Sequence, residues 1–364
     1  MSTQRLCLLV ERWPAVDRDL WRAGIAPAAL FEPAGAGASW SARTRDKFER
    51  DYGRWLAWLR DQGLLDAAQP PAARVTRDRV AAYLRDLERT CSPHTLTGRV
   101  QGLRDALRVL APDGDWAWLT GAKNALRRRA EPIHDKRARL RSPNELIGLG
   151  QDLMAQADSA LDWSAQRRAV HFRDGLAIAL LACRPVRMRN LASMRIGKHL
   201  VNQRDRYWIV FRPEETKAGQ PFEAPFPDDL VPALARYLDH HRPVLLMGEN
   251  RAEPASLDAL WVSEVATQLE QGAMGRRIIK HTKRAFGASV PPHWFRDAVA
   301  TEIAIHNPRF VDDARHMLGH ATPTTTEKFY NQAQTLQASR RYHQLVAARR
   351  HEPSRVKTGQ GDDE

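Results

Sequence analysis

The sequence has little cysteine, few tyrosines and no long apolar run. Its three cysteines, Cys7, Cys91 and Cys183, lie far apart, which argues against a disulfide framework and against a zinc site made of cysteines. The apolar stretch near the amino terminus is soon interrupted by Glu11 and Arg12, so it does not match a signal peptide. The longest apolar stretch, LAIALLAC, is too short to span a membrane. We therefore expect a cytoplasmic protein with no membrane partner.

Positive charge is in excess along the whole chain. The sequence contains 56 Lys and Arg residues against 43 Asp and Glu residues, a formal net charge of +13. Such a field attracts polyanions such as nucleic acid. A basic protein can also lack a special partner, so charge alone does not identify one. At 364 residues the chain is long for one core, and we expect two domains.

The first domain is predicted from helical periodicity after residue 38. The stretch EPAGAGAS is rich in Pro, Gly and Ala, and we expect it to end a separate amino-terminal extension, residues 1–38. Apolar residues then recur at steps of three and four, which predicts helices over 48–59, 76–89, 96–110 and 116–129. Residues 39–130 thus resemble a four-helix domain whose aromatic side chains form its core rather than a platform for stacking bases.

A basic segment follows this domain. Residues 123–141 contain eight Lys or Arg residues and two acidic ones, and Pro132 interrupts any helix there. We expect 131–143 to be a linker, either a solvated charged surface or a segment that grips duplex DNA. In the second case the DNA-binding residues are Arg127, Arg128, Arg129, Lys136 and Arg137.

The second domain is predicted to cover residues 144–347. Ser142, Pro143 and Glu145 form a capping-box pattern that starts its first helix. The sequence HFRDGLAIALLAC is apolar nearly all round, which predicts a buried helix that ends before Pro185.

A hairpin and then further helices are expected downstream. RYWIVF and FEAPFP read as two strands, joined by a loop that carries Lys217. Helical patterns resume after Leu230. Residues 348–364 form a polar tail with nothing to bury, and we expect that tail to be disordered.

Two fragments near the carboxyl end, HWFRDAV and HMLGHATPTTTEKFY, combine histidine, arginine and tyrosine. A phenol has a pKa of about 10, so a nucleophilic tyrosine needs a base and positive surroundings. His293 and Arg296 are three residues apart and would share one face of a helix. An arginine fork binds two phosphate oxygens, and phosphoryl transfer depends on such charge stabilisation. Each fragment alone is common, and the spacing is only weakly specific.

The ordered set HWFR, MLGH and TTTEKFY resembles the tyrosine recombinase (phage integrase) family. The turn RPVRMRNLASM resembles the segment that carries the upstream arginine of the family and places Arg187 there, and TKAGQPFEAPFP supplies the hairpin lysine, Lys217. Two positions depart from the family pattern. Asn190 stands where a glutamate is usual, and Tyr330 lies one residue further from His320 than in many members.

The resemblance implies a mostly α fold with a small β-hairpin or sheet, arranged as a two-domain C-shaped clamp. A helical core-binding domain would precede a mixed α+β catalytic domain. It implies that Tyr330 attacks the scissile phosphate, that Arg187 and Arg296 hold its non-bridging oxygens, and that His293 assists proton transfer. Lys217 would protonate the departing 5′ oxygen, and His320 would bind the phosphate or position the tyrosine. Neither a cofactor nor a metal is then needed, and His240, His241, His306 and His316 have no zinc-ligand spacing.

The implied function is site-specific DNA recombination or integration, carried out for a mobile element. The implied partners are double-stranded DNA with paired sites, further copies of the chain in a homotetramer on DNA, and accessory DNA-bending or directionality proteins. Two alternatives stay open. One is an accessory DNA-binding protein impaired in catalysis, and the other is an enzyme that resembles a type IB topoisomerase.

Overall fold

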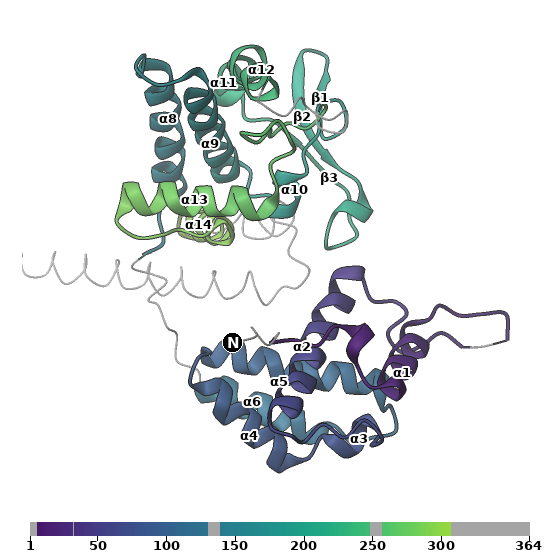
Figure 1. Cartoon of the computed structure of the whole chain (residues 1–364). Coiled ribbons are helices and arrows are strands. Elements are labelled where there is room, and N and C mark those ends of the chain that lie inside the picture. The colour runs from purple at the N-terminus through teal and green to yellow at the C-terminus, as the bar shows by residue number, and fades with distance from the viewer. Residues whose placement is uncertain (1–5, 32, 130–138, 248–256, 307–364) are drawn as a thin grey trace, which may run out of the picture. The chain divides into compact units, whose positions relative to one another are not determined.

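The computed structural model describes residues 6–31, 33–129, 139–247 and 257–306 (Figure 1). It divides into two compact units, residues 1–134 and 135–364, each with a hydrophobic core of its own. Both are mainly helical and the second holds a small sheet, which confirms the predicted fold class. None of the helices in the described ranges is long and apolar enough to cross a membrane.

The first unit contains the four predicted helices and two more. In chain order its helices are α1 (Ala15–Ile25), α2 (Ala42–Asp61), α3 (Pro71–Arg74), α4 (Arg77–Glu88), α5 (Pro93–Leu110) and α6 (Ala117–Arg129). Ser41, Thr76 and Ser92 cap α2, α4 and α5 through side-chain oxygens that accept backbone N–H groups. The aromatic residues Tyr52, Trp55 and Tyr83 are buried, as expected for a core.

The segment before residue 39 differs from the expected separate extension, because it packs into the core of the first unit. Trp13 and Trp21 are almost fully buried, and the Trp13 ring meets Tyr52 edge-on at 5.0 Å. Leu8 N donates to Gly53 O at 2.9 Å, which joins this segment to α2. The Pro- and Gly-rich stretch therefore turns the chain within one unit instead of separating two.

The second unit begins as the sequence predicts. Its helices are α8 (Pro143–Ser159), α9 (Ala165–Cys183), α10 (Met188–Ala192), α11 (Val231–Arg236), a π-helical turn (Tyr237–His241), α12 (Arg242–Leu246), α13 (Gln271–Phe286) and α14 (Pro292–His306). Ser142 Oγ accepts from Glu145 N and Glu145 Oε2 accepts from Ser142 N, so the predicted capping box forms. Helix α9 is exposed in its first turn, is buried over most of its length from Ala169 to Ala182, and ends at Cys183, before Pro185.

The sheet has three antiparallel strands in the order β1-β2-β3, β1 being Leu200–Gln203, β2 Arg206–Phe211 and β3 Phe222–Pro225. Strands β2 and β3 confirm the predicted hairpin, with Ile209 opposite Ala224. Strand β1 was not predicted. It joins β2 through a turn in which Arg204 and Asp205 have φ values of 51° and 61°, a left-handed conformation for which glycine or asparagine is the usual sequence signal.

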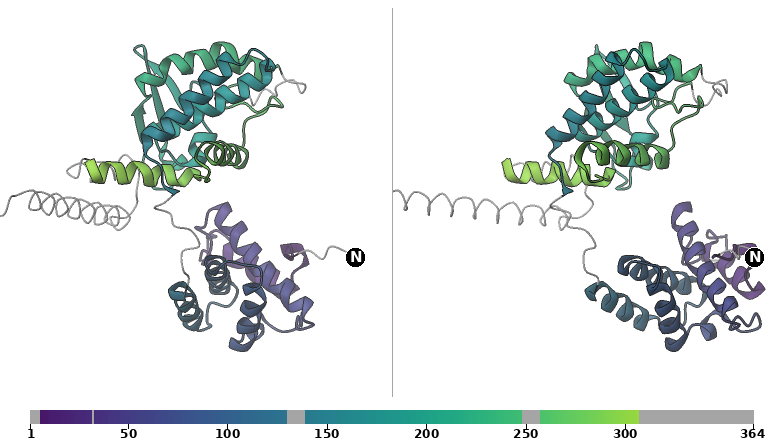
Figure 2. Two further views of the ribbon diagram at one scale, coloured as in Figure 1. Left: turned by 90° about the vertical axis from the view of Figure 1, so that its left-hand side faces the viewer. Right: turned by 60° about the vertical axis from the view of Figure 1, so that its left-hand side comes forward.

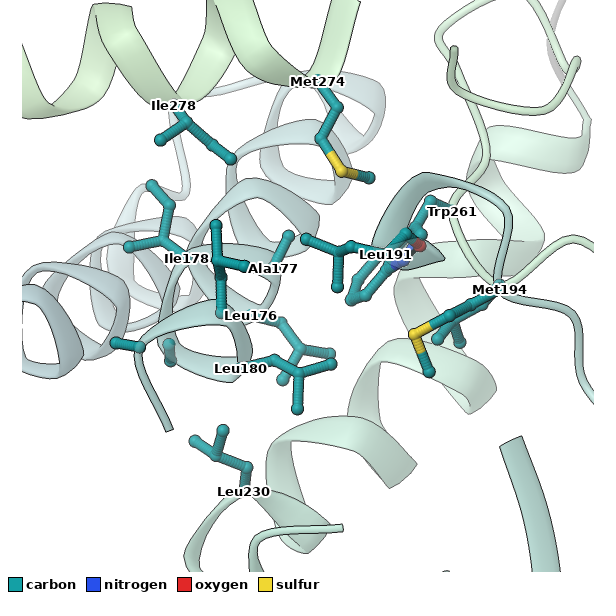
Figure 3. Close-up of a cluster of buried hydrophobic side chains, with 14 of the residues drawn as sticks. Leu176, Ala177, Ile178, Leu180, Leu191, Met194, Leu230, Trp261, Met274 and Ile278 are labelled. Atoms are coloured by element: carbon teal, nitrogen blue, oxygen red, sulfur yellow. Dashed lines mark hydrogen bonds between the residues drawn. The ribbon is translucent and has the colours of Figure 1, made fainter. Parts of the chain in front are cut away.

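The core of the second unit lies between α8, α9, α13 and the sheet. Helices α8 and α9 run side by side (Figures 1 and 2), and α14 packs against α8, α9 and α13. Leu176 and Ile178 of α9 lie near Ile278 of α13 in a closely packed aliphatic cluster (Figure 3). This cluster fixes the two elements from which the candidate site residues emerge, namely the end of α9 and the start of α14.

Candidate active site

Arg187 is held at a turn between two helices. Helix α9 ends, Pro185 and Val186 are buried, and Arg187 then caps the short helix α10, its carbonyl accepting from Leu191 N at 3.0 Å. The side chain is partly buried, and this burial lowers the pKa of its guanidinium. At this turn the Arg187 guanidinium has lost part of its hydration, and a bound anion would stabilise its charged form.

Two side chains from a distant loop hold α10 in place. Trp261 Nε1 donates to Leu191 O at 2.8 Å, and Gln268 Nε2 donates to Ala192 O at 2.9 Å. Trp261 is fully buried against Leu191 (Figure 3). Asn190, which stands where the family has a glutamate, is buried on the same helix. Trp261 and Gln268 were missed from sequence because no local spacing connects them to Arg187.

Arg296 projects from α14 toward the same turn. Its neighbour Phe295 is fully buried and fixes the helix against the core. Arg296 Nη1 donates to Pro185 O at 2.6 Å, so this guanidinium binds the backbone two residues before Arg187. The structure therefore joins two arginines that are more than a hundred residues apart in sequence.

The two arginines form an electrostatically unfavourable pair. The pKa of Arg296 is lowered to about 10, first by burial and then by the nearby positive charge of Arg187, while Asp297 acts in the opposite direction. Keeping two cations together in a partly buried place is unfavourable without an anion. A phosphate group, whose oxygens accept from guanidinium forks, would relieve this repulsion.

His293 lies in the first turn of α14, one helical turn before Arg296. Its side chain is exposed, and its ring meets that of Trp294 edge-on at 6.1 Å. The helical register confirms the predicted three-residue step on α14, which places His293 and Arg296 toward the same side of the helix.

Lys217 is exposed in the loop between β2 and β3, as predicted. The loop is ordered by Thr216, whose Oγ1 donates to Gln220 O at 2.7 Å, and by Gly219 with a φ of 65°. At the start of the loop, Glu215 accepts a hydrogen bond from Lys198, which precedes β1. This hydrogen bond is the main cause that lowers the pKa of Glu215 to about 2. Lys217 is not among the groups that shift the pKa of Arg296.

The remaining predicted residues fall elsewhere. Arg127, Arg128 and Arg129 are exposed in the last turn of α6 in the first unit. His320, Tyr330, Lys136 and Arg137 lie outside the described residues, as do most of the predicted linker and the polar tail. The described site therefore consists of Arg187, Arg296 and His293, with Lys217 on a hairpin of the same unit.

Solved structures share the fold at low sequence identity. The structure of the XerH site-specific recombinase bound to difH substrate in a pre-cleavage complex aligns with a TM-score of 0.52 and 14% identity, over 81% of this chain and 78% of that one. Its post-cleavage complex with palindromic difH gives a TM-score of 0.51 and 13% identity, over the same shares. A lambda integrase (75-356) dimer bound to a COC′ core site has a TM-score of 0.49 and 15% identity, over 81% and 90%.

Sequence comparison assigns the chain to a family. No curated protein matches it. The model of the phage integrase family matches residues 152–336, which include every residue of the described site and also His320 and Tyr330. This match covers half of the chain, and the chain therefore belongs to the phage integrase family.

Proposed function

We propose that this protein is a site-specific DNA recombinase or integrase of a mobile element, which cleaves and rejoins DNA through a 3′-phosphotyrosyl intermediate. The observation that carries the proposal is the pairing of Arg187 with Arg296, because two partly buried cations at one turn create a site for a phosphate. Membership of the phage integrase family and the fold shared with DNA-bound XerH support it.

The proposed reaction needs only groups of the protein and the DNA. The phenol oxygen of Tyr330 forms a bond to the scissile phosphorus as the bond from phosphorus to the 5′ oxygen breaks. His293 assists the transfer of the phenol proton, Lys217 gives a proton to the departing 5′ oxygen, and His320 binds the phosphate or positions the tyrosine. The phosphotyrosyl bond conserves the energy of the phosphodiester, so a 5′-hydroxyl from a second duplex completes strand exchange by the reverse step.

Charge stabilisation is the role proposed for the arginine pair. The five-coordinate transition state carries more negative charge on its non-bridging oxygens than the starting diester does. Arg187 and Arg296 are already partly removed from water, so their interaction with that charge is stronger than it would be at an exposed surface. The hydrogen bond from Arg296 to Pro185 O holds the Arg296 guanidinium at the turn that carries Arg187 before the DNA arrives.

Duplex DNA with paired sites is the proposed substrate, and a homotetramer is the proposed assembly. Arg127, Arg128 and Arg129 at the end of α6, followed by Lys136 and Arg137, are proposed to contact the DNA backbone. Accessory DNA-bending or directionality proteins are proposed to select the direction of the reaction.

A comparison of binding with covalent capture tests this function. The probe is a supercoiled plasmid that carries the DNA flanking the gene in its genome, together with nicked duplexes cut from the same region. Wild-type protein should become covalently linked to DNA and recombine paired sites, whereas Tyr330→Phe should bind equally well and form no adduct. Relaxation of any plasmid without exchange of strands between sites would point instead to a topoisomerase.

An accessory role without cleavage is a second candidate. Asn190 in place of the usual glutamate and the longer step from His320 to Tyr330 favour it. Equal DNA binding by wild-type protein and Tyr330→Phe, with no adduct from either on DNA that both bind specifically, would establish this alternative and refute the proposed enzyme.

A further inference from the structure

A second basic cavity lies in the second unit, away from the candidate site. It has a volume of about 300 Å³ and lies between the start of α9 and the middle of α13. None of Arg187, Lys217, His293 and Arg296 lines it. Its α9 residues run from Ser164, the N-cap, to His171, whereas Arg187 follows the other end of that helix, which is about 28 Å long at 1.5 Å per residue.

Behind two residues that line the cavity, Arg277 and His281, lies a carboxylate neutralised from inside the protein. Asp174 is buried, and its Oδ2 accepts from Arg277 Nε at 2.6 Å and contacts His281 Nε2 at 2.9 Å, while Oδ1 accepts from Arg173 at 2.7 Å. Burial alone would raise the pKa of Asp174, but Arg173, His281 and Arg277 outweigh it and lower that pKa well below its usual value. The carboxylate is thus fully used in holding its partners and offers little repulsion to an incoming anion.

The mouth of the cavity carries uncompensated positive charge. Arg167, Arg277, Lys280 and Arg284 line it against a single lining carboxylate, Glu264, and that carboxylate is bound by Arg277 at 2.7 Å. Lys280 and Arg284 are exposed and lie four residues apart on α13, so their like charges repel across one helical turn. Within the described ranges no ion pair involves either one.

The walls add donors of the kind that bind phosphate. The first turn of α9 lies in the wall, with Ser164 and Gln166, and contributes the positive end of the helix dipole. Arg167 lies over the ring of Trp163 at 3.9 Å, which limits the directions its guanidinium takes. His171 also lines the cavity, and its pKa is lowered to about 4 by burial and by His281, so its ring is neutral near pH 7.

From this geometry we infer that the cavity between α9 and α13 is a phosphate-binding pocket distinct from the candidate active site. Its excess charge fits an anion that carries several charges, and its volume admits a group of a few phosphates or one nucleotide. The phosphate belongs either to a free polyphosphate or nucleotide or to the backbone of duplex DNA. The inference does not depend on strand cleavage, since none of the proposed catalytic residues takes part.

Binding of tripolyphosphate to the full chain tests whether the pocket takes a free polyphosphate or nucleotide. Isothermal titration calorimetry at constant ionic strength compares wild type with Lys280→Gln/Arg284→Gln, all in the Tyr330→Phe background so that cleavage plays no part. Each charged hydrogen bond contributes roughly tenfold, so the double variant should bind about 100-fold more weakly. Arg276→Gln/Lys283→Gln is the matched control, because both residues are exposed on the same helix and neither lines the cavity.

Binding of a duplex oligonucleotide as a function of salt concentration tests whether the pocket takes phosphates of the DNA backbone. If backbone phosphates occupy the pocket, the Lys280/Arg284 variant should lower the slope of log affinity against log salt by about two, and tripolyphosphate should compete with DNA. A loss in this variant but not in the control, for either probe, supports the pocket and identifies its ligand. Equal affinities of wild type and both variants for both probes would overturn the inference, as would equal losses in the two variants.

Discussion

Two arginines, Arg74 in the first unit and Arg296 in the second, are placed in opposite electrostatic surroundings. In the first unit Arg74 is fully enclosed and makes two hydrogen bonds to the carboxylate of Asp17, at 2.8 and 2.6 Å, while Tyr52 donates to the same carboxylate at 2.7 Å. In the second unit Arg296 is partly buried, donates to a peptide carbonyl and lies near another cation, Arg187. One arginine is neutralised inside its unit and the other is kept beside a like charge.

The difference separates a contact that holds the fold from one that serves a ligand. Asp17 belongs to α1, Tyr52 to α2 and Arg74 to α3, so their cluster joins three helices. Burial, followed by the charge of Asp17, raises the pKa of Tyr52 well above its usual value, which keeps the phenol protonated as a donor. Arg187 and Arg296 carry like charges that repel one another, and such a cluster is typical of a functional site.

The largest effect is expected from breaking the closed cluster. Arg74→Met leaves the carboxylate of Asp17 buried without its cation, so the free energy of unfolding of the first unit should fall by about 3–5 kcal/mol. Urea denaturation followed by tryptophan fluorescence measures it. Asp17→Leu/Arg74→Met, which removes both charges, should recover much of the loss. A single variant as stable as wild type would show that the pair does not hold the helices.

Removing the cation Arg296 should affect the rate of the reaction strongly and the stability of the second unit little. Arg296→Gln should slow formation of the covalent DNA adduct by about 100- to 1000-fold, as expected for the loss of one preorganised donor. The unfolding transition should move little, because the hydrogen bond to Pro185 O and a like-charge contact are lost together. Arg189→Gln, an exposed arginine of α10, is the control and should leave adduct formation unchanged. If Arg296→Gln lowered stability but left the rate of adduct formation unchanged, Arg296 would hold the fold instead of serving the reaction.

A smaller effect is expected at Trp261, which is part of the core and also supports the helix that begins at Arg187. Trp261→Phe keeps the buried ring and removes the hydrogen bond to Leu191 O, which should lower the free energy of unfolding of the second unit by about 1–3 kcal/mol. Because α10 carries Arg187 at its start, adduct formation should slow while affinity for DNA changes little. Single-turnover rates measured at saturating protein separate the two, and an unchanged rate would argue that Trp261 serves stability alone.

The smallest effect concerns His171, which lines the second cavity. Its pKa is lowered to about 4 by burial and by His281, whereas in the unfolded chain the value is about 6.5. The unfolded state therefore binds more protons between these values, and this contribution to stability is present above pH 6.5 and is lost as pH falls toward 4. Proton NMR of the imidazole, with His171→Gln to assign the resonance, should give a midpoint near 4, and a midpoint near 6.5 would exclude a desolvated ring.

The parts of the fold that were predicted depend on short-range patterns. The capping box needs Ser142 and Glu145 only three residues apart, and the burial of the second half of α9 follows from its nearly continuous apolar run, residues 175–183. Strand β1 escaped prediction because its turn uses Arg204 and Asp205 in a conformation normally signalled by glycine or asparagine. The packing of Trp13 and Trp21 was missed because their contacts with α2 are long-range and span a segment rich in glycine.

The sequence indicated which residues belong to the candidate site, but not the hydrogen bonds that position them. Arg187, Lys217, His293 and Arg296 came from a resemblance of motifs, and the meeting of Arg187 with Arg296 agrees with it. The hydrogen bonds that build the site run from Arg296 to Pro185 and from Trp261 to Leu191. They join residues separated by 111 and 70 positions through backbone carbonyls, which carry no sequence signal.

Identification of the residue that becomes attached to DNA tests the central claim most directly. Protein captured on a nicked duplex from the flanking DNA would be digested with trypsin and nuclease and analysed by mass spectrometry. The account predicts a nucleotide on the peptide FYNQAQTLQASR, at Tyr330, in wild type, and a sharply reduced yield of that peptide in Arg296→Gln. Attachment at another residue such as Tyr342, or an undiminished yield in the arginine variant, would contradict it.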